Sequence, residues 1–394
     1  MEAKKKKKIF ISVGEVSADN YASELIKLMP EFEWVGITGP KMRESGCKTV
    51  EPMENLSVVG FTEIIPKYFE IKKAFKKAVN ELKNGVDLVI VVDYPGFNLK
   101  LLKEAKKLGI KTVYFIAPQV WAWGKGRIPK IVKYTDLLIS IWPFEKDIYA
   151  DYIGIDFKLI YVGHPLLDIV KTEESSESFR KKLKIPENKT IFGLLPGSRE
   201  HEIELILPTM LESARLIYNV HKELEFVIPV TPNVEKLVKE KIEENKNLPV
   251  KLVTKDKFKY PAYETMNQSK FSVITSGTAT LEAAIIGNPF VIVYKVSPVS
   301  YFIGKMLVKI PFIGLPNIVA GEEVVKELIQ EECNPVNIAN VSLKYLEDEK
   351  LWNKTKKDLK EKVKDRLGEK GALKRAAEAI IQFLNEKRRV KWIL

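Results

Sequence analysis

The sequence predicts an α/β protein with two doubly wound, Rossmann-like parallel sheets, each in its own domain. Three observations lead to this prediction. The chain has 394 residues, which is more than one hydrophobic core usually organises. Short runs rich in β-branched residues alternate with segments of helical spacing along both halves. The runs are apolar throughout, which is typical of strands that helices cover on both faces.

Five of these runs fall in the first half of the chain, and each ends at a turn signal or at glycine or proline. They are Ile9–Val13, Val86–Asp93, Lys111–Ile116, Leu137–Ile141 and Lys158–Val162. We expect them to form the sheet of an N-terminal domain over residues 1–170. Ligands of such sheets bind beyond the carboxyl ends of the strands, where the strand order reverses. Residues directly after these runs are therefore candidates for a functional site.

The second half repeats the pattern after a polar stretch, Lys171–Lys189, which we interpret as the domain boundary. Its runs are Thr190–Leu195, Glu225–Pro229, Val250–Val253, Phe271–Thr275 and Pro289–Tyr294. They predict a second domain over residues 171–345. The tail that follows, 346–394, is rich in lysine and glutamate and is expected to form helices that pack back across the domains or onto a partner subunit.

Composition narrows the class of protein. The hydrophobic content of 45% and the charged content of 29% are those of an ordinary globular chain. The formal charge of +12 favours acidic partners: nucleic acid, anionic lipid or phosphorylated small molecules. Cys47 and Cys333 lie far apart and form no CxxC pair, so neither a disulfide framework nor a zinc site is expected, in keeping with a reducing cytosol. No apolar span reaches the length of a transmembrane helix, because Lys305 and Lys309 interrupt the most apolar region.

Two strand-to-helix turns in the second half could bind a diphosphate. The first carries Gly197, Ser198 and Arg199, and a glycine, an arginine and the amides of a helix start suit phosphate oxygens. The second carries Thr278, Ala279 and Thr280, followed by Glu282, whose carboxylate could accept bonds from a ribose diol. An ordinary loop with a surface arginine explains the first equally well. A capped helix whose glutamate interacts with the helix dipole explains the second.

Other nucleotide and metal motifs do not occur. There is no GxGxxG after the first strand and no GxxxxGK[ST]. The sequence therefore disfavours redox chemistry with a dinucleotide and hydrolysis of a nucleotide at a P-loop. No Asp-x-Asp pair occurs, so the sequence does not indicate a metal ion that holds a diphosphate.

In the first half, Asp93 ends the strongest apolar run and could act as a general base toward a sugar hydroxyl. An aspartate that merely starts a turn before X-Pro-Gly is the alternative. After the first run, Glu15 and Ser17 take the same position, with Ser17 or Asp19 as a candidate helix cap. Gln119 lies beside two tryptophans near a strand end. His164 is one of three histidines, and a single histidine without a catalytic partner is more often structural than catalytic.

Two stretches suggest contact with a membrane surface. Residues 67–83, which include Phe69, are expected to form a basic helix whose apolar stripe consists of Ile71, Phe75, Val79 and Leu82. This helix could lie among lipid headgroups or pack on the sheet. The second stretch, Tyr301–Ile313, contains Phe302 and Met306 and is unusually apolar for a connection. It could be buried or face lipid.

Taken in order, eight short motifs resemble the lipid-A-disaccharide synthase family over nearly the whole chain. They are Gly14–Ser17, Val59–Glu63, Asp93–Asn98, Pro118–Trp123, Gly163–Pro165, Leu195–Arg199, Ser276–Glu282 and Leu315–Ile318. Each motif is weak alone, and the set in this order is specific.

The resemblance implies a GT-B architecture, with two domains facing a cleft and no metal or other cofactor. It implies an inverting transfer from UDP-2,3-diacylglucosamine to 2,3-diacylglucosamine 1-phosphate, which gives a β-1,6 disaccharide and UDP in lipid A biosynthesis. It also implies a cytoplasmic protein at the inner-membrane surface, with a homodimer formed by exchange of C-terminal segments. Nucleic acid is not an expected partner, because no RNA-binding signature occurs.

By the same resemblance, Asp93 matches the base and Arg199 the arginine that binds the diphosphate. Glu282 matches the ribose-binding glutamate. The remaining polar candidates have no assigned role: Glu15, Ser17, Asn98, Gln119, Asn317 and Gln330.

Two alternatives stay open on the sequence. The closest is another GT-B enzyme, such as the transferase that makes lipid II or a UDP-sugar 2-epimerase. The other, from a different class, is a non-catalytic protein that binds nucleic acid or membranes, which the charge of +12 permits.

Overall fold

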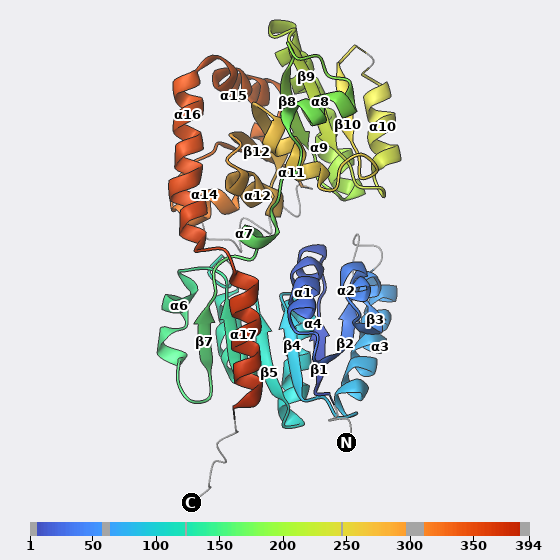
Figure 1. Cartoon of the computed structure of the whole chain (residues 1–394), viewed down its shortest axis with the longest axis vertical. Helices are drawn as coiled ribbons and strands as arrows, with labels where there is room; N and C mark the ends of the chain where they lie inside the picture. The colour runs from blue at the N-terminus through green and yellow to red at the C-terminus, as the bar shows by residue number, and fades with distance from the viewer. Residues whose placement is uncertain (1–5, 57–63, 123, 246, 297–310, 387–394) are drawn as a thin grey trace, which may run out of the picture. The chain divides into compact units, whose positions relative to one another are not determined.

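The computed structural model describes residues 6–56, 64–122, 124–245, 247–296 and 311–386. The chain divides into two compact units. Unit 1 comprises Met1–Asp168 and Gly368–Leu394, and unit 2 comprises Ile169–Leu367. Each unit contains one parallel sheet with helices on both faces, which confirms the predicted fold class (Figure 1).

The sheet of unit 1 has seven strands in the order β3-β2-β1-β4-β5-β6-β7. Their bounds are β1 (Lys8–Ser12), β2 (Glu33–Thr38), β3 (Lys48–Pro52), β4 (Leu88–Val92), β5 (Lys111–Phe115), β6 (Leu137–Ser140) and β7 (Lys158–Tyr161). All the strand pairs are parallel. The order reverses between β1 and β4, so this unit has its topological switch point there.

The sequence predicts five of these strands and misses β2 and β3. β2 begins with Glu33 and Trp34 and contains Gly36, where a Cβ would lie 1.8 Å from the Ile11 carbonyl oxygen. β3 is the edge strand, with Lys48 and Thr49 exposed. Neither has the continuous apolar run of a buried central strand.

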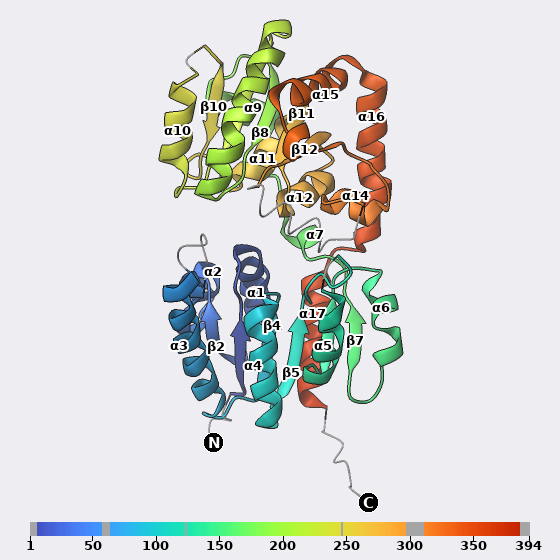
Figure 2. The ribbon, with the colours of Figure 1, turned by 180° about the vertical axis from the view of Figure 1, so that it is seen from behind.

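Helices cover both faces of this sheet. They are α1 (Val16–Leu28), α2 (Pro40–Glu44), α3 (Ile64–Leu82), α4 (Pro95–Lys107), α5 (Ile128–Tyr134), α6 (Glu145–Ile148) and α17 (Ala372–Asn385). α1 and α17 pack together on one face, while α4 and α5 lie on the other, as the reverse view in Figure 2 shows.

α17 comes from the far end of the chain and is bonded to unit 1 at both of its ends. The Asp168 carboxylate accepts the amides of Gly371 and Leu373 at 2.5 and 2.9 Å. The Arg375 guanidinium donates two bonds to the Val162 carbonyl at 2.9 and 2.7 Å. At the other end, the Lys111 ammonium donates to the carbonyls of Phe383, Leu384 and Glu386. A cation there also complements the helix dipole.

α3 is the basic helix that the sequence leaves between two interpretations. Its most buried side chains are Ala74, Ala78 and Leu82, one residue away from part of the apolar stripe expected from the sequence. Phe75 is half-buried and meets Phe97 of α4 edge to face at 5.5 Å between ring centroids. The helical period of this segment therefore reflects packing within unit 1.

The sheet of unit 2 has six strands in the order β10-β9-β8-β11-β12-β13. Their bounds are β8 (Thr190–Leu195), β9 (Leu224–Pro229), β10 (Val250–Val253), β11 (Phe271–Thr275), β12 (Phe290–Tyr294) and β13 (Glu327–Ile329). The sequence misses only β13, which has three residues and is too short for a periodic signal. The switch point of this unit lies between β8 and β11.

Helix α7 (Leu166–Ile169) lies at the boundary, with all but its last residue in unit 1. The helices of unit 2 are α8 (Ser176–Leu183), α9 (Glu200–Val220), α10 (Glu235–Glu243), α11 (Pro261–Gln268), α12 (Thr278–Ile286), α14 (Leu315–Ala320), α15 (Pro335–Glu347) and α16 (Glu349–Asp358). A core cluster of buried residues places the apolar side of α9 on β8, β9 and β11. Among the described residues, no helix combines the length and apolarity needed to cross a bilayer.

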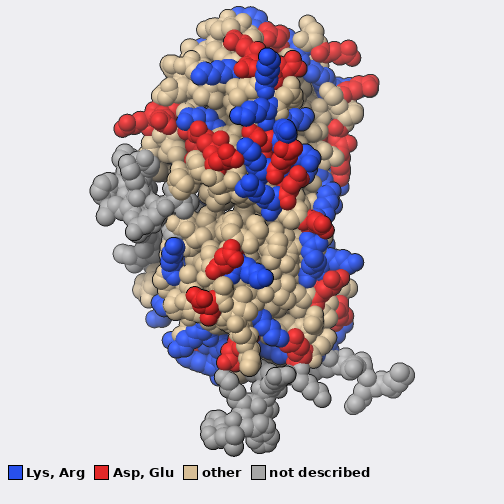
Figure 3. Space-filling model, turned by 90° about the vertical axis from the view of Figure 1, so that its left-hand side faces the viewer, with Lys and Arg blue, Asp and Glu red and all other residues tan. Residues whose placement is uncertain are grey.

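The surface carries charges of both signs. Figure 3 shows lysine and arginine intermingled with aspartate and glutamate on the face it presents. Neither sign forms a single continuous stripe on this face. Elsewhere on the surface, charges form local pairs along one helix, such as Lys239 with Glu235 of α10 at 2.7 Å. Exposed pairs of this kind contribute little to stability individually.

Candidate functional site

The first candidate site lies at the switch point of unit 1. Asp93 directly follows β4, and Glu15 follows β1, the adjacent strand, by three residues. The two carboxylates are close enough for the charge of Glu15 to act on Asp93. The parallel register therefore brings together two of the residues that the sequence singles out.

The backbone at Asp93 is strained. Asp93 and Tyr94 both have φ of +47°, and Ile116 at the end of the neighbouring strand has φ of +60°. Left-handed backbone in residues other than glycine costs about 1–3 kcal/mol each and persists only where the surroundings enforce it. Gly14 makes room for this turn, since a Cβ there would lie 2.3 Å from Cγ of the Tyr94 ring.

Asn98 is the main clamp on this turn. Its fully buried amide donates to the carbonyls of Val92 and Asp93 at 3.1 and 2.8 Å. Its oxygen accepts a bond from the Ser12 hydroxyl of β1 at 2.7 Å. The Tyr114 hydroxyl adds a second donor to the Asp93 carbonyl at 2.9 Å. Asn98 therefore holds the base candidate in place.

The environment of Asp93 tunes its proton affinity. Burial, followed by the nearby charge of Glu15, raises the pKa of Asp93 to about 6, while the Tyr94 amide and Arg127 oppose that change. A carboxylate with a pKa close to neutrality is ionised at pH 7 and still holds a proton well, which suits a general base. Arg127, at the start of α5, is a member of this site to which sequence reasoning assigned no role.

Other candidates in unit 1 have structural surroundings. α1 begins at Val16 with Glu15 as its N-cap residue, and no side chain caps it there, so the expectation that Ser17 or Asp19 caps this helix is wrong. The buried Asp19 carboxylate instead accepts the Lys41 and Met42 amides at 3.0 Å each and caps α2. Ser17 is half-buried within α1, and Gln119 is half-buried after β5.

His164 belongs to a buried aromatic group. Its ring lies 4.8 Å from that of Trp142, and its Nδ1 accepts the Leu166 amide at 3.2 Å. Burial lowers the pKa of His164 to about 3, so the imidazole stays neutral. Trp121 packs edge to face against Trp142 as well, at 5.9 Å. These contacts give the group a role in packing.

The second candidate site lies at the switch point of unit 2, in the turn after β8. Gly197 has φ of +115°, and a Cβ there would lie 2.2 Å from a carboxylate oxygen of Glu202. That carboxylate accepts the amides of Ser198 and Arg199 at 3.2 and 3.4 Å and pairs with the Arg199 guanidinium at 3.3 Å. An internal anion thus occupies donors of the kind that a phosphate would use.

The Arg199 side chain is 70% exposed, and its pairing with Glu202 is a surface contact. The turn is also held from β9's side, where the Asn233 amide donates to the Ser198 carbonyl at 3.0 Å. Glu202 is the third residue of α9, and its carboxylate accepts the amide of the N-cap residue Arg199, which is one half of a capping box.

The turn after β11 lies across the switch point from Arg199. Gly277, with φ of +153°, precedes α12, and Thr278 and Ala279 in its first turn are half-buried. Thr280 is fully buried and bonds the Gly277 carbonyl at 2.8 Å, so its hydroxyl is engaged within the turn. Glu282 accepts a bond from the Tyr263 hydroxyl at 3.1 Å. Tyr263 is a neighbour of Glu282 that the sequence analysis did not identify.

The remaining candidates lie elsewhere. Asn317 is in α14 and Gln330 directly follows β13, and both side chains bond backbone groups. Phe302 and Met306 lie outside the described residues. Among the residues that are described, no group of three or more His, Cys, Asp or Glu side chains could hold a metal ion.

Two doubly wound parallel units, each with candidate residues at its switch point, define a GT-B-like glycosyltransferase fold. A structure of MurG from Acinetobacter baumannii is similar, with a TM-score of 0.56, 14% identity and coverage of 96% of this chain and 100% of that one. A UDP-GlcNAc 2-epimerase from Neisseria meningitidis bound to UDP-GlcNAc is also similar, with a TM-score of 0.61, 14% identity and coverage of 95% and 99%. At such identities the likeness concerns the fold alone.

Sequence comparison gives the family. A model of lipid-A-disaccharide synthetase matches residues 9–382. The lipid-A-disaccharide synthase of Persephonella marina is 64% identical over 374 residues, which cover 95% of this chain and 98% of the relative. The chain therefore belongs to the lipid-A-disaccharide synthase family, the glycosyltransferases of lipid A biosynthesis, as the sequence motifs predict.

Proposed function

We propose that Asp93 is the general base and that the turns at Arg199 and at Thr278–Ala279 bind the UDP of the sugar donor. The observation that carries this proposal is the strained, clamped turn that holds Asp93 at the switch point, with its pKa raised to about 6. Strain of this kind gathers at functional sites. The donor would be UDP-2,3-diacylglucosamine and the acceptor 2,3-diacylglucosamine 1-phosphate.

The proposed reaction is a single displacement. The acceptor hydroxyl loses its proton to the Asp93 carboxylate while its oxygen forms a bond to the anomeric carbon of the donor. The bond from that carbon to the phosphate oxygen breaks, and its electron pair leaves with UDP. Arg199 and the amides at the start of α12 stabilise the charge that grows on the diphosphate. An α-linked donor then gives a β-linked product.

In this proposal, the turn at Arg199 and the turn at Thr278–Ala279 bind the same donor molecule. For the diphosphate to use the amides of Ser198 and Arg199, it must displace the Glu202 carboxylate that now accepts them. Glu282 would bind the ribose diol, with the Tyr263 hydroxyl fixing its orientation.

The test is a product assay with purified protein. Acylated and unacylated UDP-glucosamines are supplied with and without diacylglucosamine 1-phosphate, and products are identified by mass spectrometry. We expect a disaccharide 1-phosphate and UDP only when both acylated sugars are present. Epimerisation of the donor without an acceptor, or transfer to an unrelated acceptor, would instead support one of the other GT-B activities.

We also propose that the protein acts at a membrane surface, since both substrates carry acyl chains. The support is the exposed pair Tyr68 and Phe69 on α3, which are 60% and 65% accessible, beside the exposed lysines 72 and 73. Sedimentation with anionic vesicles should fall for a Tyr68→Ser, Phe69→Ser variant, and equal sedimentation would reject this surface. The homodimer that the resemblance implies is a separate proposal, which sedimentation velocity tests.

A further inference from the structure

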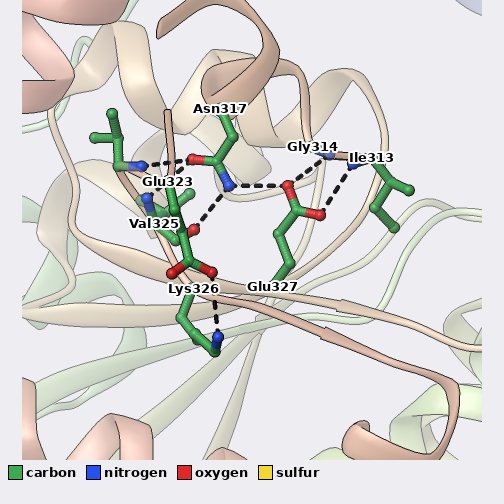
Figure 4. A network of polar contacts seen from close by, with 8 residues as sticks. Ile313, Gly314, Asn317, Glu323, Val325, Lys326 and Glu327 are labelled. Atoms are coloured by element: carbon green, nitrogen blue, oxygen red, sulfur yellow. Dashed lines mark hydrogen bonds and ion pairs between the residues drawn. The ribbon is translucent and has the colours of Figure 1, made fainter. Parts of the chain in front are cut away.

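Three polar side chains fix the backbone along β13, the edge strand of unit 2. They are Asn317 of α14, Glu327 of β13 and Gln330, which follows β13. Asn317 is fully buried, Glu327 is 7% exposed and Gln330 is half-buried. Figure 4 shows Asn317 and Glu327 pointing toward each other from two elements.

Asn317 uses its whole hydrogen-bonding capacity. Its amide nitrogen donates to the Val325 carbonyl and to the Glu327 carboxylate, both at 2.8 Å. Its oxygen accepts the amides of Val324 and Val325 at 2.8 and 3.0 Å. A side-chain amide has two donors and two lone pairs, so Asn317 has no capacity left for a ligand while these bonds persist.

Glu327 binds the chain that enters α14. Its carboxylate accepts the Ile313 and Gly314 amides, both at 2.9 Å, in addition to the Asn317 bond. Gly314 is tightly enclosed, since a Cβ there would lie 2.2 Å from Cδ1 of Ile292 in β12. A buried carboxylate that accepts three N–H bonds holds this backbone against the sheet and is costly to lose.

Gln330 binds the chain that leaves β12. Its side-chain oxygen accepts the Val296 amide at 2.7 Å, and its nitrogen donates to the Val296 carbonyl at 3.0 Å. The last backbone pair of the two strands is Tyr294 with Ile329. Gln330 extends this ladder through its side chain, and its own backbone is left-handed, with φ of +54°.

We propose that Glu327, Asn317 and Gln330 are positioning residues for the UDP-sugar site, acting through the backbone around β12, β13 and α14. α14 packs against α12, the helix that carries Thr278, Ala279 and Glu282. By holding this backbone, the hydrogen bonds of Glu327, Asn317 and Gln330 would set where α12 lies relative to the carboxyl edge of the sheet. This inference rests on the proposed function.

Two features separate positioning from simple stabilisation. A buried carboxylate and a strained glutamine are costly ways to hold a loop, and apolar packing at such sites is often as stable. A fully satisfied polar network, however, favours one arrangement of the backbone over its neighbours. The donor site requires that kind of accuracy, because small displacements of a binding group reduce rates strongly.

The experiment compares Glu327→Gln and Gln330→Glu with a matched control, Lys326→Gln. The first change leaves an NH₂ group facing N–H donors, and the second sets a carboxylate oxygen against the Val296 carbonyl. The control removes only the exposed pair of Lys326 with Glu323, whose side chains are each 46% exposed. Melting curves establish a temperature at which each variant is folded, and calorimetry then gives Kd for UDP alongside KM for donor and acceptor.

We expect both variants to weaken UDP binding and raise KM for the donor by about tenfold, which corresponds to about 1.4 kcal/mol, with KM for the acceptor unchanged. The control should match the unaltered protein. Lower melting temperatures with unchanged Kd and KM would overturn the proposal, because these side chains would then only stabilise the fold. If one of the two variants does not fold, Kd and KM of the other test the proposal. Failure of the unaltered protein to bind UDP would instead reject the proposed function.

Discussion

The two switch points of the molecule are built in opposite ways. In unit 1, Asp93 sits in a backbone that is strained and bonded on several sides, by Asn98 and Tyr114 among others. In unit 2, Arg199 is largely exposed and its turn is satisfied by Glu202. The first arrangement is bonded on several sides, whereas in the second the amide donors hold an internal anion, the Glu202 carboxylate, which a bound diphosphate would have to displace.

This difference follows from what each group must do in the proposed reaction. A base works only when its carboxylate is held at the right place with a suitable pKa, so rigidity and burial help it. A diphosphate site must open to admit its ligand and release the product, so its donors need a partner that can be displaced. The predictions below test this contrast, from the largest expected effect to the smallest.

Asp93→Asn should have the largest effect. It keeps the size of the side chain but removes the proton acceptor, so turnover should fall by about 10²–10⁴-fold. Kd for UDP should stay unchanged, because the base belongs to the other unit. Steady-state kinetics and calorimetry measure the two quantities. Asp147→Asn, at an exposed carboxylate of α6, is the control, and retained turnover in the Asp93 variant would remove the base assignment.

Arg199→Ala should show the opposite pattern. Loss of a charge-assisted bond to phosphate costs about 1.5–3 kcal/mol, so Kd for UDP should rise by about 10–100-fold. Calorimetry measures this Kd, and Arg215→Ala on the same helix provides the control, since Arg215 bonds Asn245 instead. Unchanged UDP affinity in the Arg199 variant would show that the diphosphate binds elsewhere.

The pH dependence should follow the base. The pKa of Asp93 is raised to about 6, so the reactive, ionised form is lost as the pH falls through that value. Between pH 7.5 and pH 5, kcat/KM should fall by about tenfold, as expected for a single ionisation. Stability should change in the opposite direction to the rate. The folded state holds the Asp93 proton more tightly than the unfolded state, so the free energy of unfolding falls as pH rises through about 6. A rate that is flat across this range would contradict the assignment.

Glu202→Gln should give the smallest change. If the carboxylate competes with the diphosphate, removing its charge should tighten UDP binding by about three- to tenfold, or about 1 kcal/mol. Glu204→Gln, an exposed change on the same helix, should have less effect. Calorimetry distinguishes the two, and weaker UDP binding in the Glu202 variant would mean that this carboxylate supports the site.

Much of this architecture was readable from local sequence. The central strands are apolar runs. Asp93 directly follows one of them and Arg199 lies in the turn after another, so their places at the switch points could be predicted. The strain at Asp93 could not, since an Asp-Tyr-Pro turn gives no sign of two left-handed residues. That conformation depends on Asn98 bonding two strands at once.

Most of the features that the sequence did not predict depend on contacts between residues far apart in the chain. Asn317 and Gln330 could be singled out from the resemblance, but their partners, Glu327 and Val296, are known only from the fold. The three-residue strand β13 has no periodicity to detect. The one-residue shift in the buried side of α3 has a similar cause, because α4, β3 and the turn Met53–Leu56 together determine which side chains of α3 are covered.

The return of α17 to the first sheet has a consequence for synthesis on the ribosome. Residues 1–168 emerge first, yet α17, which shares one face of their sheet with α1, begins only at Ala372. The part of that face that α17 covers stays bare until translation is almost complete, while the second unit, a continuous stretch, can finish folding earlier. We expect nascent chains ending at Leu367 to expose a protease-sensitive first unit beside a resistant second one, and a chaperone would find its binding surface there.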